Sequence, residues 1–200
     1  MTGQSNPPAS GSKLPQRVGS YELVAEIASG GMATVYLARF HGARRARRLL
    51  AIKRMHPHLA WEAGFVRMFL DEGRLAARIR HRCVVRTLEV VHLESGPIIV
   101  MEYVEGAPLS DLVATVTARN AVVPPAIVAR VMLDTLAGLQ AVHEARGERG
   151  EALHIVHRDM SPQNVLVGID GVCRITDFGL AHAAAGDAED RRSRPRSSSG

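Results

Sequence analysis

The sequence predicts an α+β fold, and three observations carry that prediction. Residues 21–40 alternate apolar and polar side chains on both sides of a Gly-Gly pair, which is the pattern of a β-hairpin. Residues 62–80 repeat apolar side chains at helical spacing instead. Short, mostly apolar runs at 49–55, 84–93 and 97–104 suit three further strands. The first half of the chain is therefore expected to form five strands and one helix.

The helix predicted over residues 62–80 carries a carboxylate on its inward stripe. Glu72 completes the apolar pattern of that stripe, which comprises Phe65, Phe69, Glu72, Ala76 and Ile79. Burying an unpaired charge costs far more than burying a paired one, so Glu72 needs a cationic partner. Gly73, its neighbour, costs the helix about 0.5 to 1 kcal/mol relative to Ala and is expected to loosen this position.

Lysine is almost absent from the chain, and its position suggests the partner of Glu72. Among the 25 basic residues only Lys13 and Lys53 are lysines, and the others are arginines. A lysine in so arginine-rich a chain indicates a site where a compact ammonium cannot be replaced by a broad guanidinium group. Lys53 lies in the apolar run 49–55, and we expect it to meet Glu72.

The composition excludes several classes of protein. Cys83 and Cys173 lack the number and spacing of a disulfide framework or zinc site, and they suit a reducing cytoplasm. Charges and prolines interrupt the longest apolar stretch, so neither a membrane segment nor an export signal is predicted. The net charge of +5 permits an anionic partner. The arginine-rich run 39–48 favours a solvated loop over a nucleic-acid site, because only Phe40 could stack on bases.

Two more helices are expected in the second half of the chain. A short one covers residues 108–116, and a longer one covers residues 124–145. Pro124 and Pro125 lie near the first turn of the longer helix, where a missing N–H costs little. Its apolar face is predicted to contain Val128, Val131, Met132, Leu136, Leu139 and Val142.

Several polar residues supply what phosphate transfer from a nucleotide requires. Gly30 and Gly31 allow the backbone of the hairpin tip to approach phosphates closely. The Lys53 ammonium can bind phosphate oxygens, oriented by Glu72. The rest of the set follows the longer helix: Asp159 can orient or deprotonate an attacking hydroxyl, and Asn164 and Asp177 offer the oxygen ligands that Mg²⁺ prefers.

Together, and in this order, these motifs resemble the protein kinase family, in particular the eukaryotic-like serine/threonine kinases of bacteria. The resemblance extends from Tyr21 to His182 and rests on IASGGMATVYLA, LLAIK, Glu72, VMEYV, HRDMSPQN and DFG. It implies a two-lobed kinase fold, with a five-stranded antiparallel small lobe plus one helix, and an incomplete, mainly helical large lobe.

The resemblance also implies where the lobes begin and end. Residues 19–104 would form the small lobe and the hinge, and residues 105–182 would form part of the large lobe with the catalytic loop and DFG. Composition predicts a disordered leader over residues 1–18 and a disordered Ser/Arg tail over residues 183–200.

ATP and Mg²⁺ are the implied ligands, and the resemblance assigns a role to each site residue. Asp159 would be the catalytic base, Lys53 and Glu72 the phosphate-contacting pair, and Asn164 and Asp177 the metal ligands. The nucleotide would meet the Gly-rich hairpin at Gly30 and Gly31. Ile27, Val35 and Ala51 would form the roof over the base, and Leu166 would form its floor. Met101 would be the gatekeeper, and Glu102 and Val104 would offer the hinge backbone.

Several positions depart from the family pattern. Ala28 and Ala33 replace the first and third glycines of the loop, which is expected to weaken nucleotide binding without excluding it. Ser161 occupies the position of a lysine that steadies the transferring phosphate, so one electrostatic contact is missing. Pro162 matches the serine/threonine pattern better than the tyrosine pattern, and it favours Ser/Thr specificity.

The expected activity is transfer of the γ-phosphoryl group of ATP to a hydroxyl of an unidentified protein substrate. The family continues after DFG through an Ala-Pro-Glu segment and several helices, so the resemblance predicts a C-terminally truncated copy. The apolar face of residues 124–145 would then be open to a partner. An ATP-binding interaction fragment that transfers nothing is the main alternative. An RNA- or DNA-binding module has only the charge of the arginine-rich loop in its favour.

Overall fold

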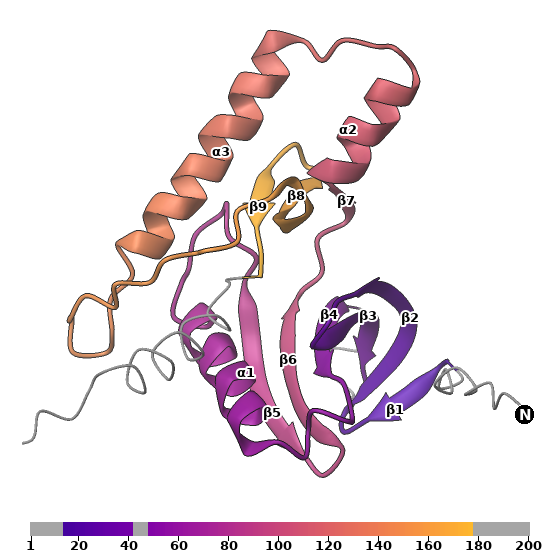
Figure 1. Ribbon diagram of the computed structural model, residues 1–200, viewed down its shortest axis with the longest axis vertical. Coiled ribbons are helices and arrows are strands. Elements are labelled where there is room, and N and C mark those ends of the chain that lie inside the picture. The colour runs from indigo at the N-terminus through magenta and orange to yellow at the C-terminus, as the bar shows by residue number, and fades with distance from the viewer. Residues whose placement is uncertain (1–13, 42–47, 178–200) are drawn as a thin grey trace, which may run out of the picture.

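The computed structural model describes residues 14–41 and 48–177. These residues form a curled six-stranded antiparallel sheet with one helix, followed by a three-stranded sheet with one short and one long helix (Figure 1). The first part of the predicted leader, most of the arginine-rich loop, the Phe and Gly of DFG and the predicted Ser/Arg tail lie outside the described residues.

The large sheet contains every strand expected from the sequence and one more. Its strands are β1 (Gln16–Val18), β2 (Tyr21–Ser29), β3 (Ala33–Phe40), β4 (Leu49–Met55), β5 (Thr87–Leu93) and β6 (Gly96–Glu102), in the order β1-β2-β3-β4-β6-β5. The expectation of five strands, with a leader reaching residue 18, is therefore wrong. Gln16 pairs with Leu23 in the ladder, and the Val18 side chain is buried in the core beneath the sheet.

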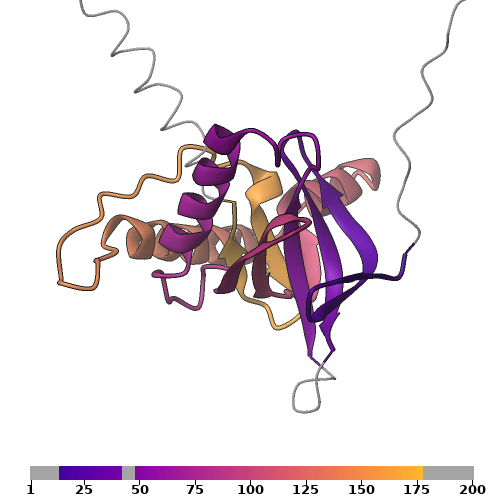
Figure 2. The same ribbon diagram turned by 90° about the horizontal axis from the view of Figure 1, so that it is seen from below.

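Helix α1 (Ala63–Ala76) lies beside β5 and β6, as Figures 1 and 2 both show. It is shorter than the predicted 62–80, and Ile79, expected on its inward stripe, is buried in the segment after its end. A Cβ atom added to Gly73 would lie 2.8 Å from Val90 Cγ2 and 2.9 Å from Ile99 Cγ1. Gly73 therefore has a role other than the expected loosening: it lets α1 approach the sheet closely and so sets the position of Glu72.

The second part of the chain contains a small sheet that the sequence did not predict. Its elements are β7 (Gly106–Pro108), α2 (Leu109–Ala118), α3 (Pro125–His143), the 3₁₀ turn η1 (Pro162–Asn164), β8 (Val165–Gly168) and β9 (Cys173–Ile175). The three strands pair in the order β7-β8-β9. Strands of three or four residues are too short to show an alternating pattern, which explains why only the helices were expected here.

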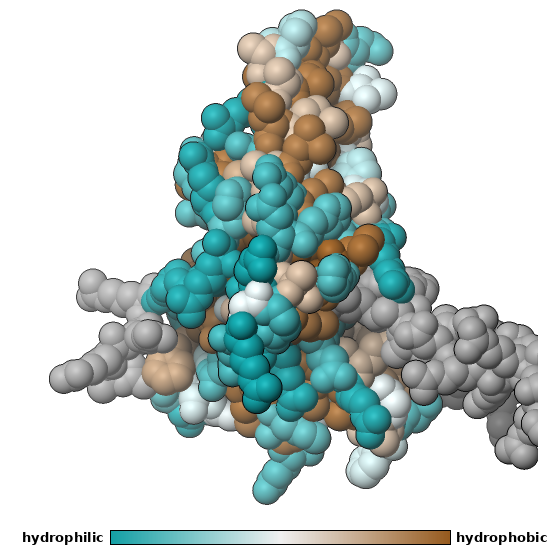
Figure 3. Space-filling model, turned by 90° about the vertical axis from the view of Figure 1, so that its left-hand side faces the viewer, coloured by the Kyte–Doolittle hydropathy of each residue, from teal (hydrophilic) through white to brown (hydrophobic). Residues whose placement is uncertain are grey.

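Helix α3 buries one side and exposes another, so the single apolar face predicted for it is split. Val142 and Gly138 are buried against the small sheet, with Val131 and Leu139 packed nearby. About half or more of each of five apolar side chains remains exposed: Ile127, Val128, Met132, Leu133 and Leu136. Apolar residues cover much of the upper part of the molecule in Figure 3. We call these five residues the α3 apolar face.

Among the described helices, α3 is also the one whose length and composition would suffice to cross a membrane, with a mean hydropathy of 1.3. Its middle carries an ion pair, in which Arg130 Nη2 lies 2.9 Å from Asp134 Oδ1. Asp134 Oδ2 also accepts a hydrogen bond from the Cys173 N–H at 3.1 Å, which ties α3 to the start of β9. These contacts make α3 the supporting helix of the small sheet.

Backbone hydrogen bonds join the end of β9 to the segment that precedes β5. The Val85 N–H donates to Ile175 O and the Ile175 N–H donates to Cys83 O, each at 2.9 Å. The segment before β5 is thereby fixed to β9. Asp177 follows β9 by two residues, so these bonds position its side chain close to β4 and α1.

Candidate active site

Lys53 lies at the centre of the site, between two carboxylates from distant parts of the chain. Its Nζ donates to Glu72 Oε1 at 2.7 Å and to Asp177 Oδ1 at 2.7 Å. Strand β4 supplies the lysine, α1 supplies the glutamate, and the segment after β9 supplies the aspartate. The pairing of Lys53 with Glu72 that the sequence predicted is present, and Asp177 joins it.

Burial and charge act against each other at this ion pair. Burial alone would lower the pKa of Lys53, but the carboxylates of Asp177 and Glu72 outweigh it and raise that pKa above its ordinary value. Burial raises the pKa of Glu72, and the Lys53 ammonium opposes that change. Asp177 is the more exposed partner, with 37% of its side chain accessible against 9% for Glu72. Lys53 therefore remains a cation held in place by two carboxylates, of which Asp177 faces solvent.

The loop before η1 holds Asp159 beside Asn164. Asn164 Nδ2 donates to Asp159 O at 2.8 Å and to Asp159 Oδ2 at 3.0 Å. The Thr176 N–H in turn donates to Asn164 O at 2.9 Å, which connects this loop to the residue before Asp177. Ser161 Oγ donates to Gln163 Oε1 at 3.2 Å. The structure thus gathers the predicted base and the predicted metal ligands in one region, with a hydroxyl where the family has a lysine.

Backbone strain and a buried histidine define the shape of this region. Arg158 and Asp177 have left-handed φ angles of 60° and 55°. Non-glycine residues in that region cost of order 1 to 3 kcal/mol and gather at functional sites. His157 Nε2 donates to Thr176 O at 3.0 Å, and burial lowers the pKa of His157 below its ordinary value. A neutral imidazole therefore fixes the loop to the segment that carries Asp177.

The donor atoms fit Mg²⁺. Asp177 provides a carboxylate and Asn164 an amide oxygen, since the Asn164 nitrogen is occupied by Asp159. Within the described ranges, no three His, Cys, Asp or Glu side chains gather as a metal site. Two oxygen donors from the chain suit Mg²⁺, which usually keeps waters and substrate phosphates among its ligands. The residues present therefore fit the metal that the family uses.

The glycine-rich tip joins β2 to β3 by a short turn with open space around it. The Gly30 N–H donates to Ala33 O at 3.0 Å, and Ser29 Oγ lies 3.1 Å from Thr34 Oγ1. A Cβ atom on Gly30 would meet only Ala33 O, at 3.8 Å, and one on Gly31 would meet nothing within 4 Å. Packing does not require glycine there, so these glycines leave the tip accessible to a ligand.

Apolar residues predicted around the base of the nucleotide converge on one cluster. Ala51 and Met101 are buried in it, and Val35, Val104 and Leu166 pack against it while remaining half-buried. The structure does not bring Ile27 into this cluster, because its side chain is 45% exposed. Five of the six apolar positions predicted for the nucleotide therefore share one surface.

The two predicted hinge residues, Glu102 and Val104, differ in whether their backbone groups already form hydrogen bonds within the described residues. The Glu102 N–H donates to Arg86 O at 3.0 Å, which occupies that donor. Among the described residues, none forms a hydrogen bond with the backbone N–H or C=O of Val104. Val104 is thus the hinge residue whose backbone donor is available to a ligand.

Two residues that support the site were not predicted as such. Gly73 allows the close packing of α1 beside Glu72, and Asp134 fixes β9 through the Cys173 N–H. Both had a signal in the sequence, since each interrupts a helical apolar pattern at an inward position.

A small cavity of about 20 Å³ between Gly73, Met101 and Asp177 has room for about one water.

Comparison with known proteins agrees with this geometry. The model of the protein kinase domain matches residues 21–197. The tyrosine-protein kinase MasK of Myxococcus xanthus is 41% identical over 170 residues, which cover 85% of this chain and 26% of MasK. The serine/threonine-protein kinase PknL of Mycobacterium tuberculosis is 34% identical over 165 residues, which cover 82% of this chain and 38% of PknL.

A solved structure shares the fold. The kinase domain of Mycobacterium tuberculosis PknI, known from a crystal structure, aligns with a TM-score of 0.63 at 26% identity, over 86% of this chain and 64% of that domain. The chain spans only 26%, 20% and 38% of the curated relatives MasK, pknA2 and PknL. The match over most of the chain confirms the predicted two-lobed fold, and the chain belongs to the protein kinase domain family.

Proposed function

We propose that the chain is a serine/threonine protein kinase that transfers the γ-phosphoryl group of ATP to a protein hydroxyl. The observation that carries this proposal is the position of Lys53, held by Glu72 on one side and Asp177 on the other. Asp159 and Asn164 lie next to this group through the Thr176 hydrogen bond. These contacts support a single site that would take the phosphates, the metal and an incoming hydroxyl.

In the proposed reaction, the hydroxyl oxygen of the substrate attacks the γ-phosphorus of ATP. The bond from that phosphorus to the bridging oxygen of ADP breaks, and ADP leaves. Asp159 orients the hydroxyl and accepts its proton. Lys53 holds the phosphates, and Glu72 keeps its ammonium in place.

Asn164 and Asp177 are the residues that would hold Mg²⁺, which when bound neutralises negative charge on the phosphates. The carboxylate of Asp177 faces solvent more than that of Glu72 does, so it is the better placed of the two for an incoming ligand. The apolar cluster of Ala51, Met101 and Leu166 would enclose the base, and Val104 would offer its backbone.

Serine and threonine are the proposed acceptors, on the basis of the loop HRDMSPQN. Pro162 begins η1 and matches the serine/threonine pattern. Relatives with both specificities in their names, MasK and PknL, resemble the chain, so the acceptor needs a direct test. After incubation with γ-³²P-ATP, Mg²⁺ and a mixed protein substrate, acid hydrolysis should release labelled phosphoserine and phosphothreonine. Label confined to phosphotyrosine would overturn the assignment.

A second candidate is an ATP-binding interaction module, which the α3 apolar face favours. Its five residues have no covering element within the described parts of the chain, and exposed apolar patches mark interaction surfaces. In this reading a partner protein covers α3, and the chain binds ATP without transferring phosphate. Both candidates belong in a reducing cytoplasm, since Cys83 and Cys173 are free, buried thiols. Mg·ATP binding in the absence of any transfer would favour the module over the enzyme.

A further inference from the structure

A second pocket, outside the Lys53 site, is lined mainly by arginines. It has a volume of about 360 Å³ and is formed by Arg80, His81, Arg82, Arg86, Glu102 and Arg174. We call it the arginine pocket. Apart from the hinge residue Glu102, it shares no residue with the proposed nucleotide site. The proposed phosphoryl transfer therefore leaves this pocket without a use.

Three of the four arginines in the arginine pocket form no ion pair with a described residue. Arg174 is paired, since its Nη2 lies 2.6 Å from Asp170 Oδ2. Arg80, Arg82 and Arg86 are exposed, and none of them forms an ion pair with another described residue. The one carboxylate of the pocket, Glu102, accepts a hydrogen bond from the backbone N–H of Arg86 at 3.0 Å. Three unpaired guanidinium groups therefore share one concave surface.

Such a pocket suits a phosphate monoester better than a carboxylate. A phosphoryl group carries a charge of about −1.5 to −2 at pH 7 and three acceptor oxygens. Guanidinium groups bind phosphate through pairs of parallel hydrogen bonds, which adds geometric selectivity to the charge. His81 Nδ1 is already engaged, since it accepts a hydrogen bond from the Cys83 N–H at 3.2 Å. The arginines are therefore the recognition groups.

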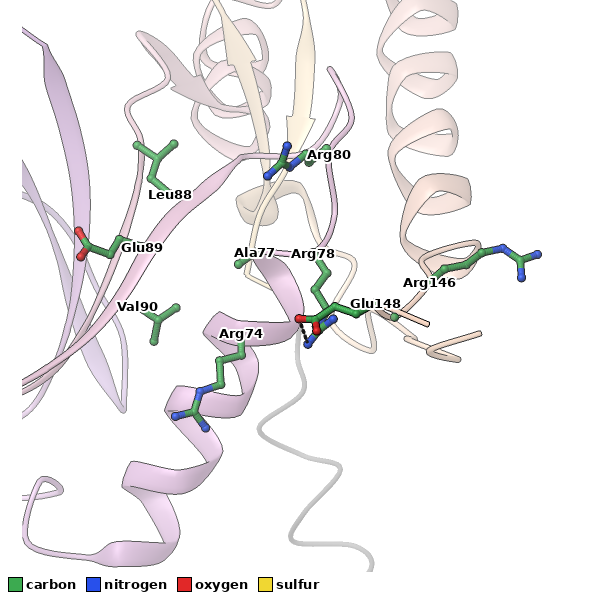
Figure 4. A pocket seen from close by; sticks show the side chains of 10 residues that line it. Arg74, Ala77, Arg78, Arg80, Leu88, Glu89, Val90, Arg146 and Glu148 are labelled. Carbon is green, nitrogen blue, oxygen red and sulfur yellow. Dashed lines mark hydrogen bonds and ion pairs between the residues drawn. The ribbon is translucent and has the colours of Figure 1, made fainter. Parts of the chain in front are cut away.

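A larger hollow beside the pocket would fit the peptide chain that carries the phosphate. Arg80 lines both spaces, and the second has a volume of about 560 Å³ (Figure 4). Ala77, Leu88 and Val90 give this hollow an apolar part. Arg78 lies beside Glu148 across it, with Nη2 3.3 Å from Oε1. Among the described residues, no Phe, Tyr or Trp lines either space, and His81 is the one ring there, so a single-stranded nucleic acid would lack a row of rings on which to stack successive bases.

From this arrangement we infer that the arginine pocket is a docking site for a phosphorylated peptide segment. Arg80, Arg82 and Arg86 bind the phosphoryl group, and residues beside the phosphorylated position lie over Leu88 and Val90. The site is separate from the catalytic one, so its occupation requires neither ATP nor Mg²⁺. It would hold a phosphorylated protein, whether substrate, product or partner, next to the hinge.

Fluorescence anisotropy of labelled peptides tests this inference on the full 200-residue chain, treated with phosphatase and kept free of ATP and Mg²⁺. The probe is a short acidic peptide with one phosphoserine followed by leucine, compared with the same peptide carrying serine. We expect the phosphopeptide to bind at least about tenfold more tightly than its serine counterpart. Arg82→Gln and Arg86→Gln should each weaken its binding by about tenfold, as expected for one lost hydrogen-bonded charge.

Arg67→Gln is the matched control, because Arg67 is an exposed arginine of α1 that lines neither space. It should leave the affinity unchanged, and unaltered urea midpoints would show that all three variants fold. Equal binding of both peptides, or an affinity that survives the Arg82→Gln, Arg86→Gln double change, would overturn the inference. So would binding of inorganic phosphate as tight as that of the phosphopeptide, or tighter arginine-dependent binding of a single-stranded oligonucleotide. Because no phosphate is transferred in this assay, its failure would leave the proposed kinase activity untouched.

Discussion

Lys53 neutralises two carboxylates, one buried and one partly exposed, that would otherwise repel each other. Its Nζ lies 2.7 Å from both Glu72 Oε1 and Asp177 Oδ1. Removing the ammonium leaves Glu72 buried without a partner, and the Asp177 carboxylate also raises the pKa of Glu72. The lysine therefore contributes to stability as well as to phosphate binding, and the two contributions can be separated by substitution.

Lys53→Met should abolish detectable ATP binding and lower the free energy of unfolding by about 1 to 3 kcal/mol, because a buried carboxylate loses its hydrogen-bonded partner. The double variant Lys53→Met, Glu72→Met should recover part of that stability without recovering ATP binding. Urea unfolding and calorimetric ATP titration measure the two effects. Undiminished ATP affinity in Lys53→Met would contradict the assigned role.

Asp134 should give the protein a pH-dependent stability that is distinct from that of the active site. Burial alone would raise its pKa, but the Cys173 N–H and the Arg130 guanidinium outweigh burial and lower it. A lowered pKa in the folded state means that the unfolded chain binds the proton more readily. The stability supplied by the Asp134 carboxylate is thus present above its ordinary pKa of 3.8 and is lost as pH falls through the lower folded-state value.

Asp134→Asn should therefore be less stable than the wild-type chain at pH 7 by about 1 to 3 kcal/mol. The gap between the two proteins should narrow as the pH is lowered from about 5 toward about 3, because the unfolded wild-type chain takes up a proton at Asp134 in this range, within about one unit of the ordinary pKa, before the folded protein does. Urea unfolding at several pH values measures the difference. A gap that stays constant over this range would show that the charge of Asp134 is not what stabilises β9.

One glycine, Gly73, allows helix α1 to pack close to the large sheet. Gly73→Ala would place a methyl group 2.8 Å from Val90 Cγ2 and 2.9 Å from Ile99 Cγ1. We expect a loss of about 1 to 3 kcal/mol in unfolding free energy from overpacking. A lower rate of phosphate transfer should accompany it, since Glu72 moves with the helix.

Gly64→Ala provides the control in the same helix. Gly64 lies in the first turn of α1, and an added Cβ would meet nothing within 4 Å. This change should be neutral or stabilise the fold by up to about 1 kcal/mol through helix propensity alone. Thermal unfolding of both variants compares them directly. Equal effects of the two substitutions would show that close packing at Gly73 is unimportant.

The sequence predicted long, periodic elements well and short or tightly packed ones poorly. The hairpin around Gly30, the strand that contains Lys53 and the helix that contains Glu72 all follow from apolar periodicity. Strand β1 and strands β7–β9 were missed, because three or four residues cannot display a pattern and their pairing depends on distant partners. The pairing of Lys53 with Glu72 was predicted from charge, whereas the Asp177 contact to the same lysine depends on tertiary packing.

The molecule as a whole has a well-packed large sheet and a less covered helical part. The α3 apolar face lies on the helix that supports β9, yet its five residues point away from the small sheet. Leu133 is the most exposed of them, at 65%. Exposed apolar surface of this kind promotes association between molecules or with a partner.

Leu133→Gln combined with Met132→Gln should therefore reduce self-association of the purified chain without lowering its stability by more than about 0.5 kcal/mol, as for other exposed positions. Light scattering after size-exclusion chromatography measures the association, and urea unfolding measures the stability. Val142→Gln is the contrasting change, because Val142 is fully buried and its loss should unfold the helical part. Self-association that persists in the double variant would show that another surface is responsible.

The most direct measurement is the initial rate of phosphate transfer from γ-³²P-ATP, in the presence of Mg²⁺, by the wild-type chain and by Asp159→Asn. The substitution keeps the size of the side chain and removes the proton acceptor. The proposed mechanism predicts measurable transfer by the wild-type chain and a loss of about 10² to 10⁴-fold in the variant, the range typical of general base catalysis, with ATP affinity unchanged. Equal rates in the two proteins, or ATP binding by the wild-type chain without any transfer, would contradict it.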